Sequence, residues 1–247
     1  MKYLTLIIIS VLLLVSSCKK GTVTNCFNTT GELVEQNRSI EGFNNILLKD
    51  NVNLILNKSE TASIKVEAGS NIISGIVTDV DENGVLEIRN DNNCNWIRSF
   101  ESPINVYLNY IDIDTLEYRS IGDITNTDKI TTDTLWLNIK EGAGQIKINL
   151  DVIRLYCSLH YGTADIILSG KCGLSYIYSA SFGLIDLIDL NTDLVYVNNR
   201  SSNDIYLNAK IHLGATIENI GNIYYTGNPE TISFDKIGDG ELIKLSN

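Results

Sequence analysis

Short stretches of alternating apolar and polar residues run through the chain from about residue 31 onward. Strict alternation predicts strands with one buried face, and the polar turn segments at 57–60 and 81–84 favour antiparallel pairing. Between residues 31 and 118 the predicted strands are Ile46–Leu48, Val52–Leu56, Ser63–Glu67, Val85–Ile88 and Ile104–Leu108. One short helix over 70–77, capped by Ser70 or Asn71, is also predicted.

From about residue 112 the pattern becomes repetitive. A small or turn residue, a polar residue and an aliphatic residue recur together, and successive aliphatic positions are separated by 22, 20, 21, 18 and 18 residues. These positions are Ile124, Ile146, Ile166, Leu187, Ile205 and Ile223. A second strand recurs between them, at Leu116–Tyr118, Leu135–Ile139, Ile153–Cys157, Leu174–Tyr176, Leu194–Val197, Ile211–Leu213 and Ile232–Phe234. Units of about 20 residues cannot enclose a core alone, so they are expected to stack as coils.

The predicted fold is therefore all-β: a right-handed parallel β-helix-like solenoid of about six coils with an N-terminal β cap. In this interpretation residues 31–118 form the N-terminal β region and residues 119–247 the solenoid repeat region, together one structural unit. Asp189 stands where the repeat requires an aliphatic residue, which predicts a local bulge or a different register there.

The first seventeen residues have the organisation of a secretory signal, with basic Lys2, an apolar run over 4–15 and two serines before Cys18. Residues 14–18, Leu-Val-Ser-Ser-Cys, resemble the lipobox of bacterial lipoproteins, whose cysteine takes a diacylglyceryl group. The resemblance implies lipidation of Cys18 and a tether over 18–30. We therefore expect a lipid-anchored protein of the outer membrane, facing either the periplasm or the outside.

Composition adds limits to this picture. Two prolines and one methionine fit strands joined by polar turns, and a formal net charge of −11 gives no basic footprint for nucleic acid, which we exclude as a partner. Beyond Cys18, four cysteines allow three disulfide pairings. The Cys26–Cys94 pair is favoured, because both lie in Asn-rich segments. Cys157 continues an inward alternation and is predicted to be a core thiol, and no pairing is assigned to Cys172.

Four aspartates occupy similar positions in successive repeats: Asp123, Asp165, Asp186 and Asp204, with Gln145 and Asn222 between and after them. Their carboxylates could line up to bind calcium or sugar hydroxyls, since hard cations prefer several converging oxygens. The favoured alternative is structural, because Asp and Asn at a repeated turn satisfy backbone amides. Calcium is thus an optional ligand, and no other metal, cofactor or catalytic residue is assigned.

Two further sets of residues are candidates for a catalytic or a binding role. Arg154 and His160, near Asp165, are candidates for an acid or base, although lone polar residues on outward positions are usually solvated. An exposed aromatic stripe could bind glycans or proteins, but cross-strand stacking explains tyrosines in a repeat at least as well. The tyrosines concerned are Tyr156, Tyr161, Tyr176, Tyr178, Tyr196, Tyr206, Tyr224 and Tyr225.

Near the C-terminus, Gly221-Asn222-Ile223 is followed by Tyr224-Tyr225, Gly227 and Pro229. This run, together with the segments 84–88, 103–107 and 238–240, resembles the family named putative auto-transporter adhesin, head GIN domain, over about residues 40–245. The resemblance implies a parallel β-helix-like domain on the cell envelope, an adhesive role and no established catalytic residues.

The function expected from the sequence is that of a non-catalytic envelope lipoprotein, an adhesin presenting one solenoid face to a glycan or protein partner. The alternative is a carbohydrate-active enzyme, a polysaccharide lyase or hydrolase, on the same scaffold.

Overall fold

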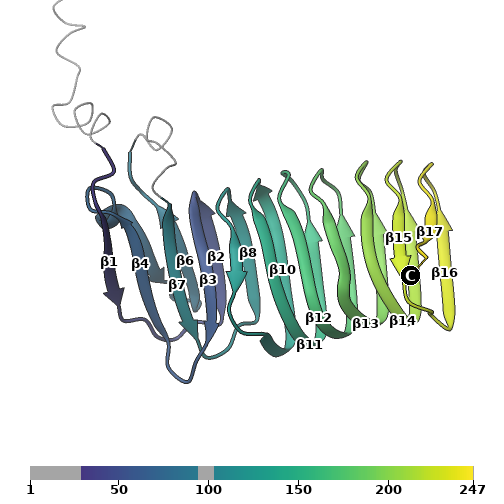
Figure 1. Cartoon of the computed structure of the whole chain (residues 1–247), viewed down its shortest axis with the longest axis horizontal. Coiled ribbons are helices and arrows are strands. Elements are labelled where there is room, and N and C mark those ends of the chain that lie inside the picture. Colours follow the sequence, from purple (N-terminus) through teal and green to yellow (C-terminus); the bar gives the residue numbers. More distant parts are fainter. Residues whose placement is uncertain (1–28, 94–102, 247) are drawn as a thin grey trace, which may run out of the picture.

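The computed structural model describes residues 29–93 and 103–246. Within these residues the chain is built from β-strands and one 3-10 turn, without an α-helix. The strands form a β-solenoid of about six turns, and Figure 1 shows them side by side along a rod that runs from β1 to β16 and β17. The predicted all-β solenoid is confirmed.

The N-terminal strands already belong to this stack. They are β1 (Leu33–Arg38), β2 (Asn45–Asp50), β3 (Val52–Lys58), β4 (Ser63–Gly69), β5 (Ile76–Val80), β6 (Val85–Asn90) and β7 (Ile104–Tyr110). β2 pairs in parallel with β6, and β3 pairs in parallel with β7. The pairs β1–β4, β4–β7 and β5–β6 are antiparallel. The antiparallel prediction is therefore wrong for β2 and β3, because alternation reports which face is buried and not the direction of the partner strand.

The predicted helix over 70–77 is also wrong in extent. The structure has a single 3-10 turn at Ile73–Gly75, without a side-chain cap, and β5 begins at Ile76.

The repeat region stacks ten strands in parallel. They are β8 (Thr115–Ser120), β9 (Ile124–Asn126), β10 (Ile130–Gly142), β11 (Gln145–Leu159), β12 (Asp165–Ser179), β13 (Ile185–Asn199), β14 (Ile205–Ile217), β15 (Ile223–Thr226), β16 (Thr231–Lys236) and β17 (Leu242–Lys244). β8 and β9 pair with β2 and β3, which joins the two regions without a break in the sheet.

The long strands β11, β12, β13 and β14 each contribute to two surfaces of the rod. In β11 the alternation slips at Ile153 and Arg154, which are both exposed between buried Val152 and Leu155. We call the surface before this corner face B; its strands are β3, β7, β9, β15, β17 and the first parts of the long strands. The surface after the corner is face A; its strands are β2, β6, β8, β16, the C-terminal half of β10 and the second parts of the long strands.

Stacked aliphatic side chains fill the space between the two faces. Each buried isoleucine contributes roughly 1.5–3 kcal/mol relative to an exposed one, and in a stack it packs on its equivalents in neighbouring coils. Along one such line Ile124, Ile146, Ile166, Ile185, Ile205 and Ile223 are at most 1% exposed.

The register along this line differs from the predicted one at a single coil. Ile185, and not Leu187, pairs with Ile166 and Ile205. The register between β12 and β13 shifts by one residue between the pairs Ile167–Asp186 and Gly170–Leu190. Asp189 lies in this interval and is exposed, so the predicted bulge is confirmed.

Glycines recur in the turns because consecutive coils approach each other closely there. A Cβ atom added at Gly144, Gly183 or Gly221 would lie 2.3, 1.9 or 2.2 Å from a carbonyl oxygen of the preceding coil. The recurring glycine in the sequence is thus a condition of stacking.

Replacing Gly183 by alanine should lower the free energy of unfolding by about 2–3 kcal/mol, because the new Cβ would overlap the carbonyl oxygen of Ala164. Urea denaturation measures this. Gly214→Ala is the matched control, since its new Cβ would meet only side-chain atoms, two ring carbons of Tyr196 and the hydroxyl oxygen of Ser233, and no backbone carbonyl. Equal stability of the two variants would contradict the steric explanation.

The two cysteines in the described residues, Cys157 and Cys172, are buried free thiols, which confirms the prediction for Cys157. Cys26 and Cys94 lie outside the described residues, so their pairing stays a prediction. Burial raises the pKa of both Cys157 and Cys172 to about 12.

Because the thiolate is the reactive form, Cys157 and Cys172 should react with N-ethylmaleimide at least about 100-fold more slowly in the folded protein than in concentrated guanidinium chloride. Peptide mass spectrometry after timed labelling measures this. Rapid labelling of either cysteine under native conditions would show that the core is more open than described.

Candidate functional site

Four successive strands of face A carry an outward aromatic side chain at equivalent positions. Trp136 pairs with Tyr156, Tyr156 with Tyr176, and Tyr176 with Tyr196. Their ring centroids are 3.9, 5.1 and 5.3 Å apart and their planes differ by 7°, 7° and 16°. These four rings, which we call the aromatic row, form one continuous stack along the rod.

The predicted tyrosine stripe is only partly one surface. Tyr156, Tyr176 and Tyr196 belong to the aromatic row, whereas Tyr206 and Tyr224 form a separate stacked pair on face B, 5.0 Å apart. Tyr161 lies in a turn and Tyr225 is buried. Tyr178 lies beside the aromatic row. Trp136 was not predicted as part of this stripe, although it stands one repeat before Tyr156.

The aromatic row ends at a glycine. The residue paired with Tyr196 on the next coil is Gly214, which is followed by Ser233 on β16. A Cβ atom at Gly214 would lie 2.8 Å from Cδ1 of Tyr196, so the ring leans over the glycine. His212 lies at the edge of this position, with its ring centroid 5.3 Å from that of Tyr196 and tilted by 49°.

A groove of about 570 Å³ runs beside the aromatic row on face A. Its lining includes a second line of side chains two residues further along each strand, which we call the polar row. The polar row consists of Asn138, Ser158, Tyr178, Asn198, Thr216 and Asp235. The groove is thus bordered by aromatic rings on one side and by hydrogen-bonding groups on the other.

Hydrogen bonds made by members of the polar row join neighbouring coils. The hydroxyl of Ser158 donates to Oδ1 of Asn138 over 3.0 Å, and Nδ2 of Asn198 donates to Oε1 of Glu218 over 2.8 Å. Oδ1 of Asn198 is buried and has no hydrogen-bond partner within the described residues. A buried acceptor without a partner costs free energy, and the described residues hold two more such atoms, the Tyr110 hydroxyl and Oδ1 of Asn149.

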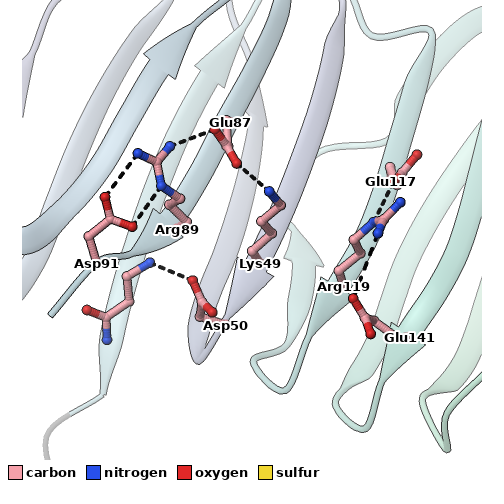
Figure 2. Close-up of polar contacts among 9 residues, drawn as sticks. Lys49, Asp50, Glu87, Arg89, Asp91, Glu117, Arg119 and Glu141 are labelled. Atoms are coloured by element: carbon pink, nitrogen blue, oxygen red, sulfur yellow. Dashed lines mark hydrogen bonds and ion pairs between the residues drawn. The ribbon is translucent and has the colours of Figure 1, made fainter. Parts of the chain in front are cut away.

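The N-terminal half of face A has a different chemistry. Figure 2 shows Lys49 of β2 and Arg89 of β6 on either oxygen of Glu87, each 2.6 Å away. Arg89 also contacts Asp91 at 2.8 Å and holds the pKa of this carboxyl below its ordinary value through a hydrogen bond.

The same pattern continues on the next strand. Arg119 of β8 contacts Glu117 at 2.7 Å and lies 3.9 Å from Glu141 (Figure 2). Each of these exposed ion pairs contributes about 0–1 kcal/mol. Because every cation here has an acidic partner, this half of the face is a compensated, hydrated surface.

All four predicted ladder aspartates accept a hydrogen bond from a backbone amide; for Asp186 the donor is Ile188 of its own strand, over 3.2 Å. The amides of Gln145, Leu184 and Asn222 on the following coil donate to carboxylate oxygens over 2.8, 3.0 and 2.7 Å. The acceptors are Asp123, Asp165 and Asp204, in that order.

Asp186 is out of line with these three. Asp186 pairs with Ile167 and Tyr206 on the neighbouring coils. Ile167 lies two residues after Asp165, and Tyr206 lies two residues after Asp204. The other three aspartates lie on every second coil, about 10 Å apart. The described residues contain no group of three or more His, Cys, Asp or Glu side chains that could hold a metal ion. A ligand-binding role of the aspartates stays a prediction.

The predicted acid–base candidates are not brought together. Arg154 lies at the corner of β11, and His160 follows the other end of that strand, roughly 20 Å away at 3.3 Å per residue. His160 packs against Tyr178 with a centroid distance of 5.5 Å, and its pKa is lowered by burial and by Lys140. The carboxylate of Asp165 accepts the amide of Leu184.

The fold and its outward faces define a parallel β-solenoid that presents rows of side chains on its surface. A model of the family described as "Putative auto-transporter adhesin, head GIN domain" matches residues 42–229, and the chain belongs to this family. Membership indicates a protein of the cell surface or envelope. In the part of the chain that is described, no helix is long and apolar enough to cross a membrane.

Solved structures share the fold. The chain is similar to a putative adhesin of Bacteroides fragilis (22% identity, TM-score 0.79, covering 87% of this chain and 97% of that one). It is also similar to a putative lipid binding protein of Parabacteroides distasonis (20% identity, TM-score 0.70, covering 87% of this chain and 98% of that one). A third similar structure is that of a putative adhesin of Parabacteroides merdae (18% identity, TM-score 0.66, covering 88% of this chain and 98% of that one). No curated protein matches the chain.

Proposed function

We propose that this protein is a non-catalytic binding module of the cell envelope that presents the C-terminal half of face A to a glycan or protein partner. The observation that carries the proposal is the aromatic row beside the groove. Trp136, Tyr176 and Tyr196 are 43%, 41% and 41% exposed although they are large and apolar. Exposed aromatic residues of this kind are the usual anchors of recognition surfaces.

The rigidity of the aromatic row supports a recognition role. Each ring is held between neighbours on adjacent coils, so binding would cost little additional side-chain entropy. The scaffold below it is a continuous parallel sheet with a buried aliphatic core. A pre-organised surface of this kind favours binding over a role that needs movement.

Face B offers less to a partner. Its outward asparagines bond to one another between coils, with Nδ2 of Asn53 donating to Asn105 over 2.9 Å and Nδ2 of Asn57 donating to Asn109 over 2.8 Å. Side-chain amides that already satisfy each other gain little from exchanging these bonds for a ligand. This contrast supports face A as the binding surface.

The separation of Arg154 and His160 by roughly 20 Å supports a binding role over a catalytic one, because general acid–base catalysis needs groups within reach of one substrate bond. The lipobox-like segment ending at Cys18 supports attachment of the module to the outer membrane by acyl chains.

Soluble protein that begins at Lys19 is screened against arrayed glycans and surface proteins. In this screen the double variant Tyr156→Ala/Tyr176→Ala should lose the binding shown by the wild type. The matched control is Tyr206→Ala/Tyr224→Ala, which removes the stacked pair of face B. We expect at least a tenfold weaker affinity for the first variant and little change for the second. Equal loss in both, or release of glycan products by the wild type, would refute the proposal.

Cys18→Ala should abolish incorporation of radiolabelled palmitate and move the protein from the membrane fraction to the soluble fraction. The reason is that the thiol of Cys18 is the predicted acylation site. Cys26→Ala is the control and should keep both label and membrane association. A Cys18→Ala protein that remains labelled and membrane-bound would rule out this anchor.

A further inference from the structure

The two ends of the rod, marked in Figure 1 by β1 and by β16, have different outer surfaces. At the N-terminal end, β1 presents the polar residues 35–38, Glu-Gln-Asn-Arg. At the C-terminal end, the last strand of face A is β16, and each of its residues is exposed. Solenoids need terminal repeats with a polar outer face to remain soluble. The C-terminal end has no such cap within the described residues.

The inward positions of β16 have the residues of a core strand. Ile232 pairs with Leu213, and Phe234 pairs with Ala215, on the neighbouring strand β14. Leu213 and Ala215 are 0% and 3% exposed, whereas Ile232 and Phe234 are 46% and 41% exposed. The apolar interior of the solenoid therefore continues to its C-terminal end and is uncovered there.

The sheet is also unpaired at this end. Within the described residues β16 pairs with β14 alone, and β17, the last strand of face B, pairs with β15 alone. An edge strand with apolar side chains is a template for pairing with another chain. The C-terminal end thus combines an open sheet edge with an uncovered core.

We infer that this end is the interface of a symmetric dimer, in which the β16 strands of two copies pair in antiparallel orientation across a twofold axis at Ser233. The same surface of each copy meets its equivalent, as in most closed homodimers. The joined strands continue face A from one copy into the next and cover the core of both. The inference goes beyond the proposed function and does not depend on it.

The sequence of β16 and its flanks is complementary to itself in this register. With the axis at Ser233, Ile232 lies opposite Phe234 of the second copy, and Glu230 lies opposite Lys236 of the second copy. Apolar side chains then meet apolar ones and opposite charges meet, which is the favourable arrangement of cross-strand pairs. An axis at either neighbouring residue would place Glu230 or Lys236 opposite an apolar side chain. An axis between two residues would set inward positions against outward ones.

The N-terminal end is a poorer partner for this surface. Its strand β1 has polar residues where Ile232 and Phe234 need an apolar cover, and Glu35 is bound to Lys65 of β4 at 2.8 Å. A contact between unlike ends would also repeat without limit and form filaments. Two C-terminal ends close on each other, so the dimer is the arrangement that the sequence of β16 favours.

Dimerisation enlarges the binding surface of face A. Ser233, Phe234 and Asp235 line the end of the groove beside the aromatic row. Joining two β16 strands therefore brings two grooves and two aromatic rows onto one continuous sheet. A partner with repeated epitopes can contact both copies at once, which raises its affinity through effective concentration.

Analytical ultracentrifugation of soluble protein that begins at Lys19, in reducing buffer and without ligand, tests the dimer. The wild type should show a monomer–dimer equilibrium. Phe234→Asp should weaken dimerisation at least about tenfold, because it places a carboxylate in the joined core. Ile220→Asp is the matched control: Ile220 is 60% exposed in a turn outside β16, and this variant should dimerise like the wild type.

Disulfide trapping tests the register, in a chain whose Cys26 and Cys94 are replaced by serine. Ser233→Cys should form a linked dimer with copper phenanthroline as the oxidant, because directly opposite residues have Cβ atoms about 4.5–5.5 Å apart. Asp235→Cys should not link to itself, since Thr231 of the second copy lies opposite. A mixture of Asp235→Cys and Thr231→Cys chains should link.

Circular dichroism confirms that each variant is folded, and if Phe234→Asp does not fold, disulfide trapping decides alone. A wild type that stays monomeric at every concentration, or a folded Phe234→Asp that dimerises as well as the wild type, would overturn the inference. Linkage through Asp235→Cys without linkage through Ser233→Cys would do the same. Failure of the dimer leaves the proposed function intact, because the aromatic row lies within one copy.

Discussion

The close contact between the turn glycines of one coil and the carbonyl oxygens of the coil before it sets the geometry of the solenoid. At Gly183 and Gly221 any side chain would overlap a neighbouring carbonyl oxygen. Because the turns stack without side chains between them, each strand lies directly on its equivalent at the ordinary strand spacing of about 4.8 Å. The parallel register, the stacked aliphatic core and the outward rows of side chains all depend on this spacing.

The same spacing arranges the side chains of the surface in rows. A repeated position that is aromatic in four coils becomes a stack of rings, and a repeated position that is polar becomes a chain of hydrogen bonds. Gly214 ends the aromatic row, and Asn198 leaves one buried oxygen without a partner in the described part of the chain. The rows of this surface are thus formed by repetition and end where a single residue departs from the repeat.

The sequence predicts the solenoid well because its determinants are local and repeated: alternation within strands, glycine in turns and an aliphatic residue after each turn. Even the bulge at Asp189 is visible as a polar residue in an aliphatic position. The direction of pairing for β2 and β3 could not be predicted, since alternation is the same in parallel and antiparallel sheets. The choice of Leu187 over Ile185 failed because both fit an inward position and only pairing with neighbouring coils distinguishes them.

The candidate site is less accessible to sequence reasoning. The tyrosines were noticed, but their division between face A and face B depends on where each long strand turns its corner. The prediction that Asp186 lies in line with the ladder aspartates is wrong for the same reason, because it depends on Leu187 being the aliphatic position of that coil.

The most direct test of the binding surface is fluorine NMR of the protein labelled with 3-fluorotyrosine, titrated with a glycan or protein that it binds. The account predicts that the resonances of Tyr156, Tyr176 and Tyr196 shift together while those of Tyr206 and Tyr224 stay in place. Shifts at Tyr206 and Tyr224 without change in the aromatic row would contradict it.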